Sequence, residues 1–292
     1  MIPIGLCAQL ACIWEATARK PGNVHRFRDF EGTTYLDFIQ SAVAIAPVLE
    51  RASEQRVGET ILQCVRATQA ITRTNTNLGI ILLLSPLAAV PLDENLRTGI
   101  KRVVADLDVA DSRAAYQAIR LAKPGGLGQA SKQDINQEPT LPLQEVMALA
   151  ADRDMIARQY LTCYEEVFND GVPALLQAID KRPSVSFEEA IIHCQLCLMA
   201  KYPDSLIARK TCVKEAHEAA SMAAETLARF WEGEKKRWEE LTKLDAWLRA
   251  EGNRRNPGTT ADLVTACLFI ALREGSITMP LAMPFFAGDL YD

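Results

Sequence analysis

Apolar residues recur at three- and four-residue steps along nearly the whole chain. In residues 35–51, for example, Leu36, Ile39, Val43 and Leu49 fall on one stripe, which is the spacing of an amphipathic helix. No segment of useful length alternates apolar and polar residues as a half-buried strand does. The pattern therefore predicts an all-α fold. The other expected helices cover residues 61–71, 78–90, 96–107, 111–122, 143–152, 153–169, 172–179, 187–201 and 206–250, the last with an interruption at Gly233.

Two segments, residues 78–90 and 263–272, are apolar on every side. A helix of that kind has to be buried, and neither run reaches the roughly 20 residues that a membrane span needs. We therefore expect a single multi-helix globular domain over residues 1–292, with these two buried helices at its centre. A division of this domain into two lobes is left open.

A polar, glycine-containing run precedes each buried helix, at residues 74–79 and 256–262. Such a run places backbone N–H groups and side-chain oxygens at the start of a buried helix, where an anionic ligand is favoured. The same side chains would also serve as simple helix caps. The two runs are the main indication of function in the hydrophobic pattern.

Composition and charge narrow the class of protein. The chain is 49% hydrophobic and 24% charged with a net charge of −5, which is typical of a soluble protein and disfavours non-specific nucleic-acid binding. The N-terminal stretch carries its basic residues after its apolar residues, unlike a secretory signal. We therefore expect a cytoplasmic protein that acts on neither nucleic acid nor membranes.

The eight cysteines have no repeating spacing, and most lie among apolar residues. This is typical of cysteines that pack as small hydrophobic side chains. His193, Cys194 and Cys197 form the one group that resembles a metal or redox site, and those two alternatives stay open beside structural packing.

Five polar clusters interrupt the helical pattern. Residues 20–29 combine a turn with basic side chains that are suited to phosphates. Residues 75–77 are three consecutive polar residues, more than one helix cap requires, so some of them could contact a ligand. Residues 123–128 form a glycine-rich turn. Asp204 is placed as an N-cap, and Arg209 lies within its reach if residue 206 onward is helical. Residues 252–262 read either as a cradle for a polyanion or, through Thr259 and Asp262, as a capping box; Ser186 and Glu189 have the same capping-box spacing.

Four of these motifs, in this order, resemble the triphosphoribosyl-dephospho-CoA synthase family. They are residues 20–26 (KPGNVHR), 75–79 (NTNLG), 203–205 (PDS) with Arg209, and 257–263 (PGTTADL). The resemblance covers about residues 15–272. It implies an all-helical transferase that joins the ribose C1 of ATP to the 2′-hydroxyl of 3′-dephospho-CoA and releases adenine.

That reaction needs a base for the attacking hydroxyl, a proton or hydrogen-bond donor for the departing adenine, and cations for the triphosphate. The resemblance implies Asp204 and Asp262 as catalytic residues that act as a base or hold Mg²⁺, which carboxylates would bind beside the triphosphate. It also implies phosphate contacts by Lys20, Arg26 and Arg209. The remaining ATP-binding positions that it implies are His25, Asn75, Thr76, Asn77, Gly79, Gly258, Thr259 and Thr260.

The second motif departs from the family pattern. Where typical members read Asn-Thr-His-Lys-Gly, this chain has Asn77 and Leu78 at the histidine and lysine positions. The acceptor could therefore differ. A related nucleotide-dependent enzyme of methanopterin-type one-carbon cofactor biosynthesis, acting on a pterin-cofactor precursor, is the alternative enzyme. A non-catalytic nucleotide-binding helical protein is the alternative from another class. A homodimer is left open.

Overall fold

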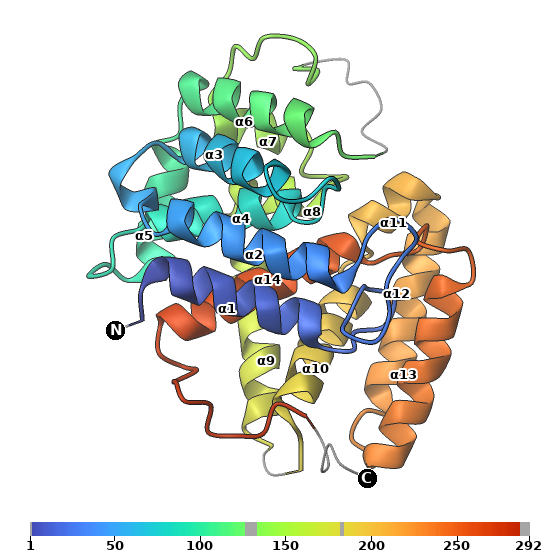
Figure 1. Cartoon of the computed structure of the whole chain (residues 1–292). Helices are drawn as coiled ribbons and strands as arrows, with labels where there is room; N and C mark the ends of the chain where they lie inside the picture. The colour runs from blue at the N-terminus through green and yellow to red at the C-terminus, as the bar shows by residue number, and fades with distance from the viewer. Residues whose placement is uncertain (1, 126–132, 182–183, 287–292) are drawn as a thin grey trace. The chain divides into compact units, whose positions relative to one another are not determined.

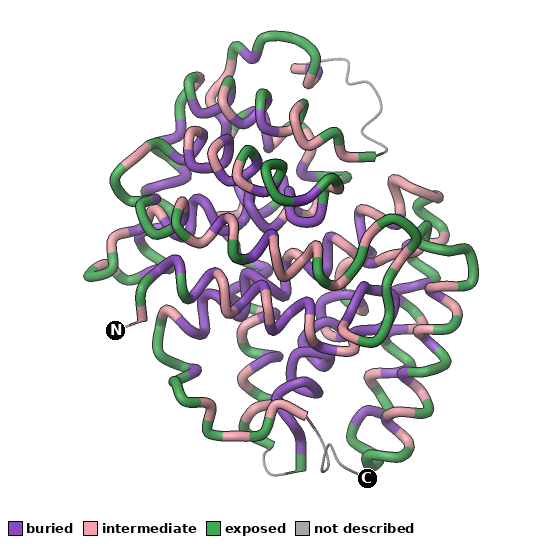
Figure 2. The backbone as a smooth tube through the Cα atoms, viewed as in Figure 1, coloured by how far each residue is buried: buried purple, intermediate pink, exposed green. Residues whose placement is uncertain are grey.

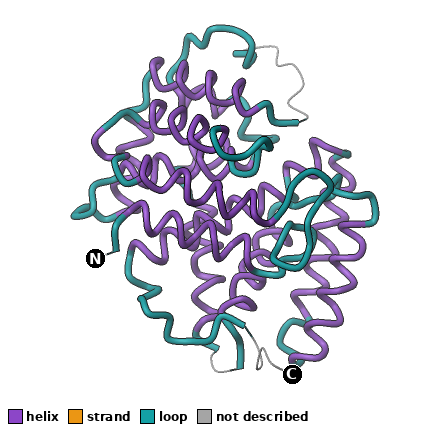
Figure 3. The backbone as a smooth tube through the Cα atoms, viewed as in Figure 1, coloured by secondary structure: helices purple, strands orange, loops and turns teal. Residues whose placement is uncertain are grey.

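A computed structural model describes residues 2–125, 133–181 and 184–286. These residues form fourteen α-helices, a 3₁₀ turn and a π-helical turn, with no strand among them, so the predicted all-α class is confirmed (Figure 1 and Figure 3). The helices are α1 (Ile4–Thr17), α2 (Tyr35–Leu49), α3 (Val57–Gln69), α4 (Leu78–Ala89), α5 (Leu96–Ala105), α6 (Val109–Ala122), α7 (Leu143–Ala148), α8 (Met155–Thr162), α9 (Val172–Ile179), α10 (Phe187–Lys201), α11 (Ser205–Lys210), α12 (Val213–Ala228), α13 (Glu234–Arg249) and α14 (Gly258–Arg273). The 3₁₀ turn η1 is Ala52–Glu54, and the π-helical turn η2 is Val167–Gly171.

The chain forms two compact units. The first contains the chain up to Ile13 together with Leu36–Glu166, and the second contains Trp14–Tyr35 together with the chain from Val167 onward. Each unit has its own buried helix, α4 in the first and α14 in the second (Figure 2). The prediction of one domain spanning residues 1–292 stays a prediction.

In the first unit, α4 packs against α3, α5, α8 and η1. Every residue of α4 is buried except Gly79 and Ala89, as its apolar sequence predicts. Pro86 lies inside α4 and has no N–H, so the carbonyl of Leu82 lacks its regular helical donor. The Tyr160 hydroxyl of α8 supplies the missing donor, with 2.7 Å between Tyr160 Oη and Leu82 O. The buried helix therefore keeps its proline because a neighbouring helix satisfies the orphaned carbonyl.

In the second unit, α10 packs against α9, α12 and α14, and α14 also contacts α9 and α11. The helices α12 and α13 form a hairpin (Figure 1) whose apolar stripe joins the same core. Both α10 and α14 are buried over most of their length. They are the fixed elements that carry the polar residues described below.

The helix boundaries confirm some predictions and correct others. Residues 172–179 and 187–201 are helical as expected. The stretch 206–250 contains three helices, because the chain breaks at Thr211 as well as at Gly233, where φ is 111° and favours glycine. The first helix, α1, was not among the expected elements. The glycine-rich turn at residues 123–128 lies partly outside the described residues.

No helix in the described ranges combines the length and apolarity needed to cross a membrane.

We predict that Tyr160→Phe lowers the free energy of unfolding by about 1–3 kcal/mol, because it leaves the buried Leu82 carbonyl without a donor. Tyr164→Phe is the matched control. Tyr164 also donates to α4, at Leu83 O over 2.8 Å, but Leu87 can donate its backbone N–H to that carbonyl. Urea unfolding of both variants tests this. Equal losses would contradict the explanation.

Candidate functional site

The first motif, residues 20–26, is a tight loop of the second unit that follows α1. Gly22 has a φ of 78°, a region that favours glycine. A Cβ at this position would lie 2.8 Å from both Leu248 Cδ1 and Pro257 Cδ. The Gly22 N–H donates to Asp245 Oδ1 over 2.8 Å. Packing against α13 and against the lead-in to α14 therefore accounts for the glycine of this motif.

Asn23 joins the first motif to the fourth. Its amide nitrogen donates to Asn256 Oδ1 over 2.7 Å, and its amide oxygen accepts from Gln195 Nε2 of α10 over 2.9 Å. Gln195 also donates to the Pro21 carbonyl over 3.0 Å. The Asn23 amide thus fixes the loop both to α10, through Gln195, and to the lead-in of α14, through Asn256.

Asp204 joins the third motif to the fourth. Its Oδ1 accepts from the backbone N–H groups of Leu206 and Ile207 over 2.8 and 3.0 Å, which confirms the predicted N-cap of α11. Its Oδ2 accepts from both the N–H and the hydroxyl of Thr260 in the first turn of α14, over 2.7 and 2.8 Å. A single carboxylate therefore holds the starts of two helices.

The capping box predicted for Thr259 and Asp262 is wrong. The helix α14 begins at Gly258, so Thr259 lies inside its first turn instead of before it. The Thr259 hydroxyl accepts from Ser205 Oγ over 3.0 Å. Asp204, more than fifty residues earlier in the chain, supplies the acceptor that a local cap would have provided.

Asp204 does not fit the role of a magnesium ligand. The side chain is 1% exposed, and four donors occupy its two oxygens, which have about four acceptor positions in total. Burial raises the pKa of this carboxyl, while the hydrogen bonds from Thr260, Ile207 and Leu206 act in the opposite direction. The described residues contain no group of three or more His, Cys, Asp and Glu side chains that could hold a metal ion. Asp262 is partly exposed on α14 and stays the other predicted carboxylate.

Lys20 is completely buried and forms an ion pair. Its Nζ lies 2.8 Å from Glu15 Oε1 and donates to the Glu15 carbonyl over 2.5 Å. A buried ammonium needs such a partner, since its desolvation is costly. A phosphate contact by Lys20 stays a prediction, and it would require this pair to open.

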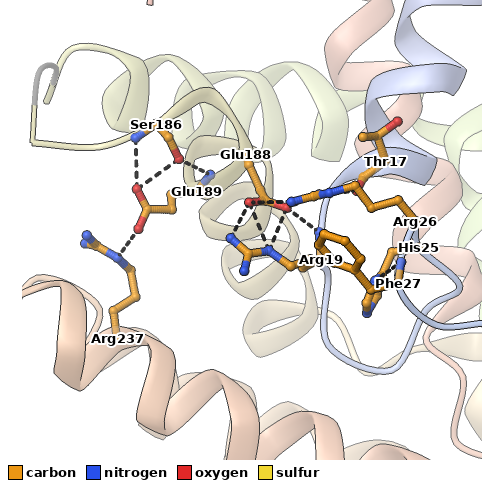
Figure 4. Close-up of polar contacts among 9 residues, drawn as sticks. All are labelled: Thr17, Arg19, His25, Arg26, Phe27, Ser186, Glu188, Glu189 and Arg237. Atoms are coloured by element: carbon orange, nitrogen blue, oxygen red, sulfur yellow. Dashed lines mark hydrogen bonds and ion pairs between the residues drawn. The ribbon is translucent and has the colours of Figure 1, made fainter. Parts of the chain in front are cut away.

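Glu188, in the first turn of α10, is a buried carboxylate that the sequence pattern did not reveal. Arg19 Nη2 lies 2.6 Å from Glu188 Oε2, and Arg26 Nη1 lies 2.5 Å from Glu188 Oε1 (Figure 4). Arg26 also donates to the Thr17 carbonyl over 2.7 Å. Burial acts to raise the pKa of Glu188, but the hydrogen bonds from the two arginines outweigh it and leave that pKa below its ordinary value of 4.5. Arg26, predicted to contact phosphate, is thus bound by a carboxylate of its own unit.

Aromatic rings cover the Arg26 guanidinium. Its central carbon lies 4.5 Å from the ring centre of Phe27 and 4.0 Å from that of Phe286. The segment that carries Phe286 also contacts α10, because the Pro284 and Phe285 carbonyls accept from the N–H groups of Phe187 and Glu188 over 3.0 and 2.8 Å. The C-terminal segment therefore helps to position the first motif.

The start of α10 has a second buried ion pair. Ser186 and Glu189 form the capping box that their spacing predicted. The free oxygen of Glu189 accepts from Arg237 Nε of α13 over 2.8 Å (Figure 4). The sequence signal for Glu189 was its spacing from Ser186. Glu188 has no comparable local signal, because its partners lie far earlier in the chain.

His25 is a buried neutral imidazole. Its Nδ1 accepts from the Phe27 N–H over 3.3 Å, so the proton of the neutral ring is assigned to Nε2. Burial, followed by the charges of Arg249 and Lys20, lowers the pKa of His25 to about 4. At neutral pH His25 is therefore a hydrogen-bond donor through Nε2 and not a cation.

The second motif belongs to the first unit. Thr76 Oγ1 lies 2.6 Å from Ser41 Oγ, and the Asn77 amide nitrogen donates to Thr68 Oγ1 over 3.1 Å. Asn75 Oδ1 accepts from the N–H of Leu78 over 3.2 Å, so Asn75 and not the N-cap residue Asn77 caps α4. Gly79 is partly exposed on α4. A cavity of about 440 Å³ opens beside this motif within the same unit.

The structure brings three of the four motifs together in the second unit, whereas the second motif lies in the first. A transferase family model matches almost the whole chain. The chain belongs to the ATP:dephospho-CoA triphosphoribosyl transferase family, whose profile matches residues 2–279. A solved structure from Archaeoglobus fulgidus, a candidate triphosphoribosyl-dephospho-CoA synthase, is similar to this chain with 25% identity and a TM-score of 0.62, covering 80% of this chain and 98% of the other. No curated protein matches the sequence.

We predict that Glu188→Gln lowers the free energy of unfolding by about 3 kcal/mol at pH 7, because it leaves two guanidinium groups without their buried carboxylate. The folded-state pKa of Glu188 is below 4.5, so its contribution is present above pH 4.5 and is lost as the pH falls through the folded pKa. The difference from the unsubstituted protein should therefore shrink on acidification. Chemical unfolding at several pH values measures it, with the exposed Glu239→Gln as the control. A loss that is independent of pH would contradict the ion-pair explanation.

We also predict that His25 titrates near pH 4 as the Nε2-protonated tautomer. The unfolded chain binds this proton near pH 6.5, so stability decreases as the pH falls from 6.5 toward 4. Nitrogen-15 NMR of the ring reports both tautomer and titration. A midpoint near 6.5, or a proton on Nδ1, would contradict a buried neutral imidazole whose Nδ1 accepts from Phe27.

Proposed function

We propose that this chain transfers the triphosphoribosyl group of ATP to the 2′-hydroxyl of 3′-dephospho-CoA and releases adenine. The observation that carries the proposal is the family match over residues 2–279, which includes all four motifs. Two sets of hydrogen bonds support it: Asn23 binds Asn256 and Gln195, and Asp204 binds Thr260. Together they hold three of those motifs against the two buried helices of the second unit.

The reaction exchanges one bond at the ribose C1 for another. The C1–N9 bond to adenine breaks with its electron pair on adenine, and a C1–O bond forms to the acceptor hydroxyl. The hydroxyl proton is lost and adenine gains a proton, so atoms and charges balance without an oxidant or reductant. The protein has to accept the first proton and assist the departure of adenine.

We assign the base to Asp262, one turn inside α14 and partly exposed. We assign Asp204 to positioning, since its oxygens already accept four hydrogen bonds. His25 Nε2–H would serve as a hydrogen-bond donor toward a leaving base. Arg209, partly exposed in the last turn of α11, would contact phosphate together with the backbone around Gly258.

Other parts of the proposal rest on the family alone. ATP is a substrate of the family reaction. A triphosphate in the cell carries Mg²⁺, but Asp204 does not suit the metal because its oxygens already accept four hydrogen bonds. A cytoplasmic location follows from the proposed substrates. In the first unit, Asn75, Thr76, Asn77 and Gly79 stay proposed nucleotide contacts, and a homodimer stays a prediction.

The test is chromatographic detection of adenine released from ATP with and without 3′-dephospho-CoA. We expect release only with the acceptor. Asp262→Asn should reduce the rate by about a hundredfold or more with little change in melting temperature, as expected for a lost general base. Asp204→Asn should instead lower the melting temperature. Asp180→Asn, an exposed residue at the end of α9, is the matched control and should leave both unchanged.

Two outcomes would contradict the proposed reaction, and a third would contradict only the assignment of its base. Adenine release only with a pterin precursor would support the alternative enzyme. Tight ATP binding without release would support a non-catalytic binding protein. Full activity of Asp262→Asn would remove Asp262 from the base role while leaving the reaction itself intact.

A further inference from the structure

The C-terminal half of α13 carries a charged pair beside its apolar stripe. Leu241, Leu244 and Leu248 are buried in the core of the second unit. Asp245 and Arg249 each follow one of these leucines directly, so they lie on the flank of the stripe. Arg249 Nε donates to Asp245 Oδ1 over 2.7 Å, and the side chains of Arg249 and Asp245 are only 12% and 17% exposed. Because such enclosure removes both charges from water, the pair needs further polar partners.

Both members of this pair contact the loop that carries the first motif. Asp245 Oδ1 also accepts from the Gly22 N–H over 2.8 Å. Arg249 Nη2 donates to the Asn23 carbonyl, and the guanidinium carbon lies 5.1 Å from the ring centre of Phe30. The carboxylate therefore holds one backbone group of the loop, and the guanidinium holds a backbone group of the next residue.

The same carboxylate also holds the far side of His25. The His25 N–H donates to the Arg28 carbonyl over 3.0 Å, and the Arg28 N–H donates back to the His25 carbonyl over 2.8 Å. Arg28 Nη1 in turn donates to Asp245 Oδ2 over 2.9 Å. This last contact is largely exposed, so the contacts at Gly22 and Asn23 hold the loop more firmly. His25 thus lies between two attachments of its loop to Asp245.

The pair also contributes to the electrostatic surroundings of the His25 ring. The charged groups that act on this ring are Arg249 and Asp245 of α13, together with Lys20 and Arg26 of its own loop. Burial lowers the pKa of His25 most, followed by Arg249 and Lys20, whereas Asp245 raises it. The two members of one ion pair therefore act on the same imidazole in opposite directions.

We propose that Asp245 and Arg249 are positioning residues of the candidate site, which hold the loop of residues 22–28 and keep the His25 ring between two opposite charges. Neither residue belongs to the four sequence motifs. The catalytic consequence rests on the proposed function, in which His25 Nε2–H donates toward the departing adenine. The placement of the ring itself does not depend on that reaction.

Two variants test this placement in the ligand-free protein by nitrogen-15 NMR of the His25 ring. Arg249→Gln removes a neighbouring cation, so the titration midpoint of His25 should rise toward 6.5. Asp245→Asn removes a neighbouring anion but keeps an oxygen for the Gly22 N–H, so the midpoint should fall below that of the unsubstituted protein. Movement of both midpoints in the same direction would overturn the proposal, because the ring would then not lie between the two charges.

Lys243→Gln is the matched control for both variants. Lys243 is an exposed residue of the same helix, and it pairs with Glu240 one turn away. Its replacement should leave the His25 midpoint unchanged. If Arg249→Gln and Asp245→Asn have the same midpoint as this control, the pair only stabilises α13 and the proposal is wrong.

Arg249→Lys separates the charge of Arg249 from its geometry. Lysine keeps the positive charge but lacks the planar fork that reaches Asp245 and the Asn23 carbonyl together. The His25 midpoint should therefore stay near 4. In the proposed reaction, kcat for adenine release should fall at least about tenfold while KM for ATP stays within about twofold, because the misplaced donor would act only in the transition state. An unchanged kcat would overturn the positioning role.

Failure of the positioning role and failure of the proposed reaction give different results. If the His25 midpoints move as expected but the unsubstituted protein releases no adenine, the placement of the ring stands and the reaction fails. If Arg249→Lys, Asp245→Asn and the Lys243→Gln control all release adenine with the kcat of the unsubstituted protein, the reaction stands and the positioning role fails. Ring titration and adenine release are therefore measured on the same preparations.

Discussion

A charge removed from water has to be paired or fully hydrogen-bonded, and the second unit is organised around this constraint. Among its buried carboxylates, Glu188, Glu189 and Asp204 each draw together segments that are distant in sequence, whereas Glu15 pairs with Lys20 in the adjoining loop. Because an unpaired buried charge costs several kcal/mol by general estimates, these pairs favour one arrangement of the loop between α1 and α2. The apolar cores supply the stability, and the ion pairs determine which polar side chains meet.

This constraint changes how the basic residues of the first motif are interpreted. Lys20 and Arg26 have the chemistry that binds phosphate, and the sequence identified that chemistry correctly. In the folded chain they neutralise Glu15 and Glu188. Arg26 and Glu188 are 162 residues apart, a separation that no local spacing rule can reveal. A motif can therefore be right about residue type while leaving the role of each residue to the tertiary structure.

The fold was easier to predict than the site, for a physical reason. Helical periodicity is a local property, so α9 and α10 could be predicted with correct ends. The break at Thr211 was missed because no glycine or proline marks it, and α1 was missed because its apolar residues form no clear stripe. Of the two sets of hydrogen bonds that Asp204 accepts, only one could be predicted from the sequence. Its bonds to α11 follow from an adjacent N-cap, whereas its bonds to Thr260 depend on how two helices pack.

The C-terminal segment that contacts α10 also bears on the order in which the protein is made. The carbonyls of Pro284 and Phe285 bind the first turn of α10, although the ribosome adds these residues long after that helix. The second unit also needs Trp14–Tyr35 from near the start of the chain. Domains fold as their residues emerge, so the ring stacking on Arg26 cannot be completed until nearly all of the described chain has been synthesised. Removing residues 284–286 would therefore disturb a loop that lies far earlier in the chain.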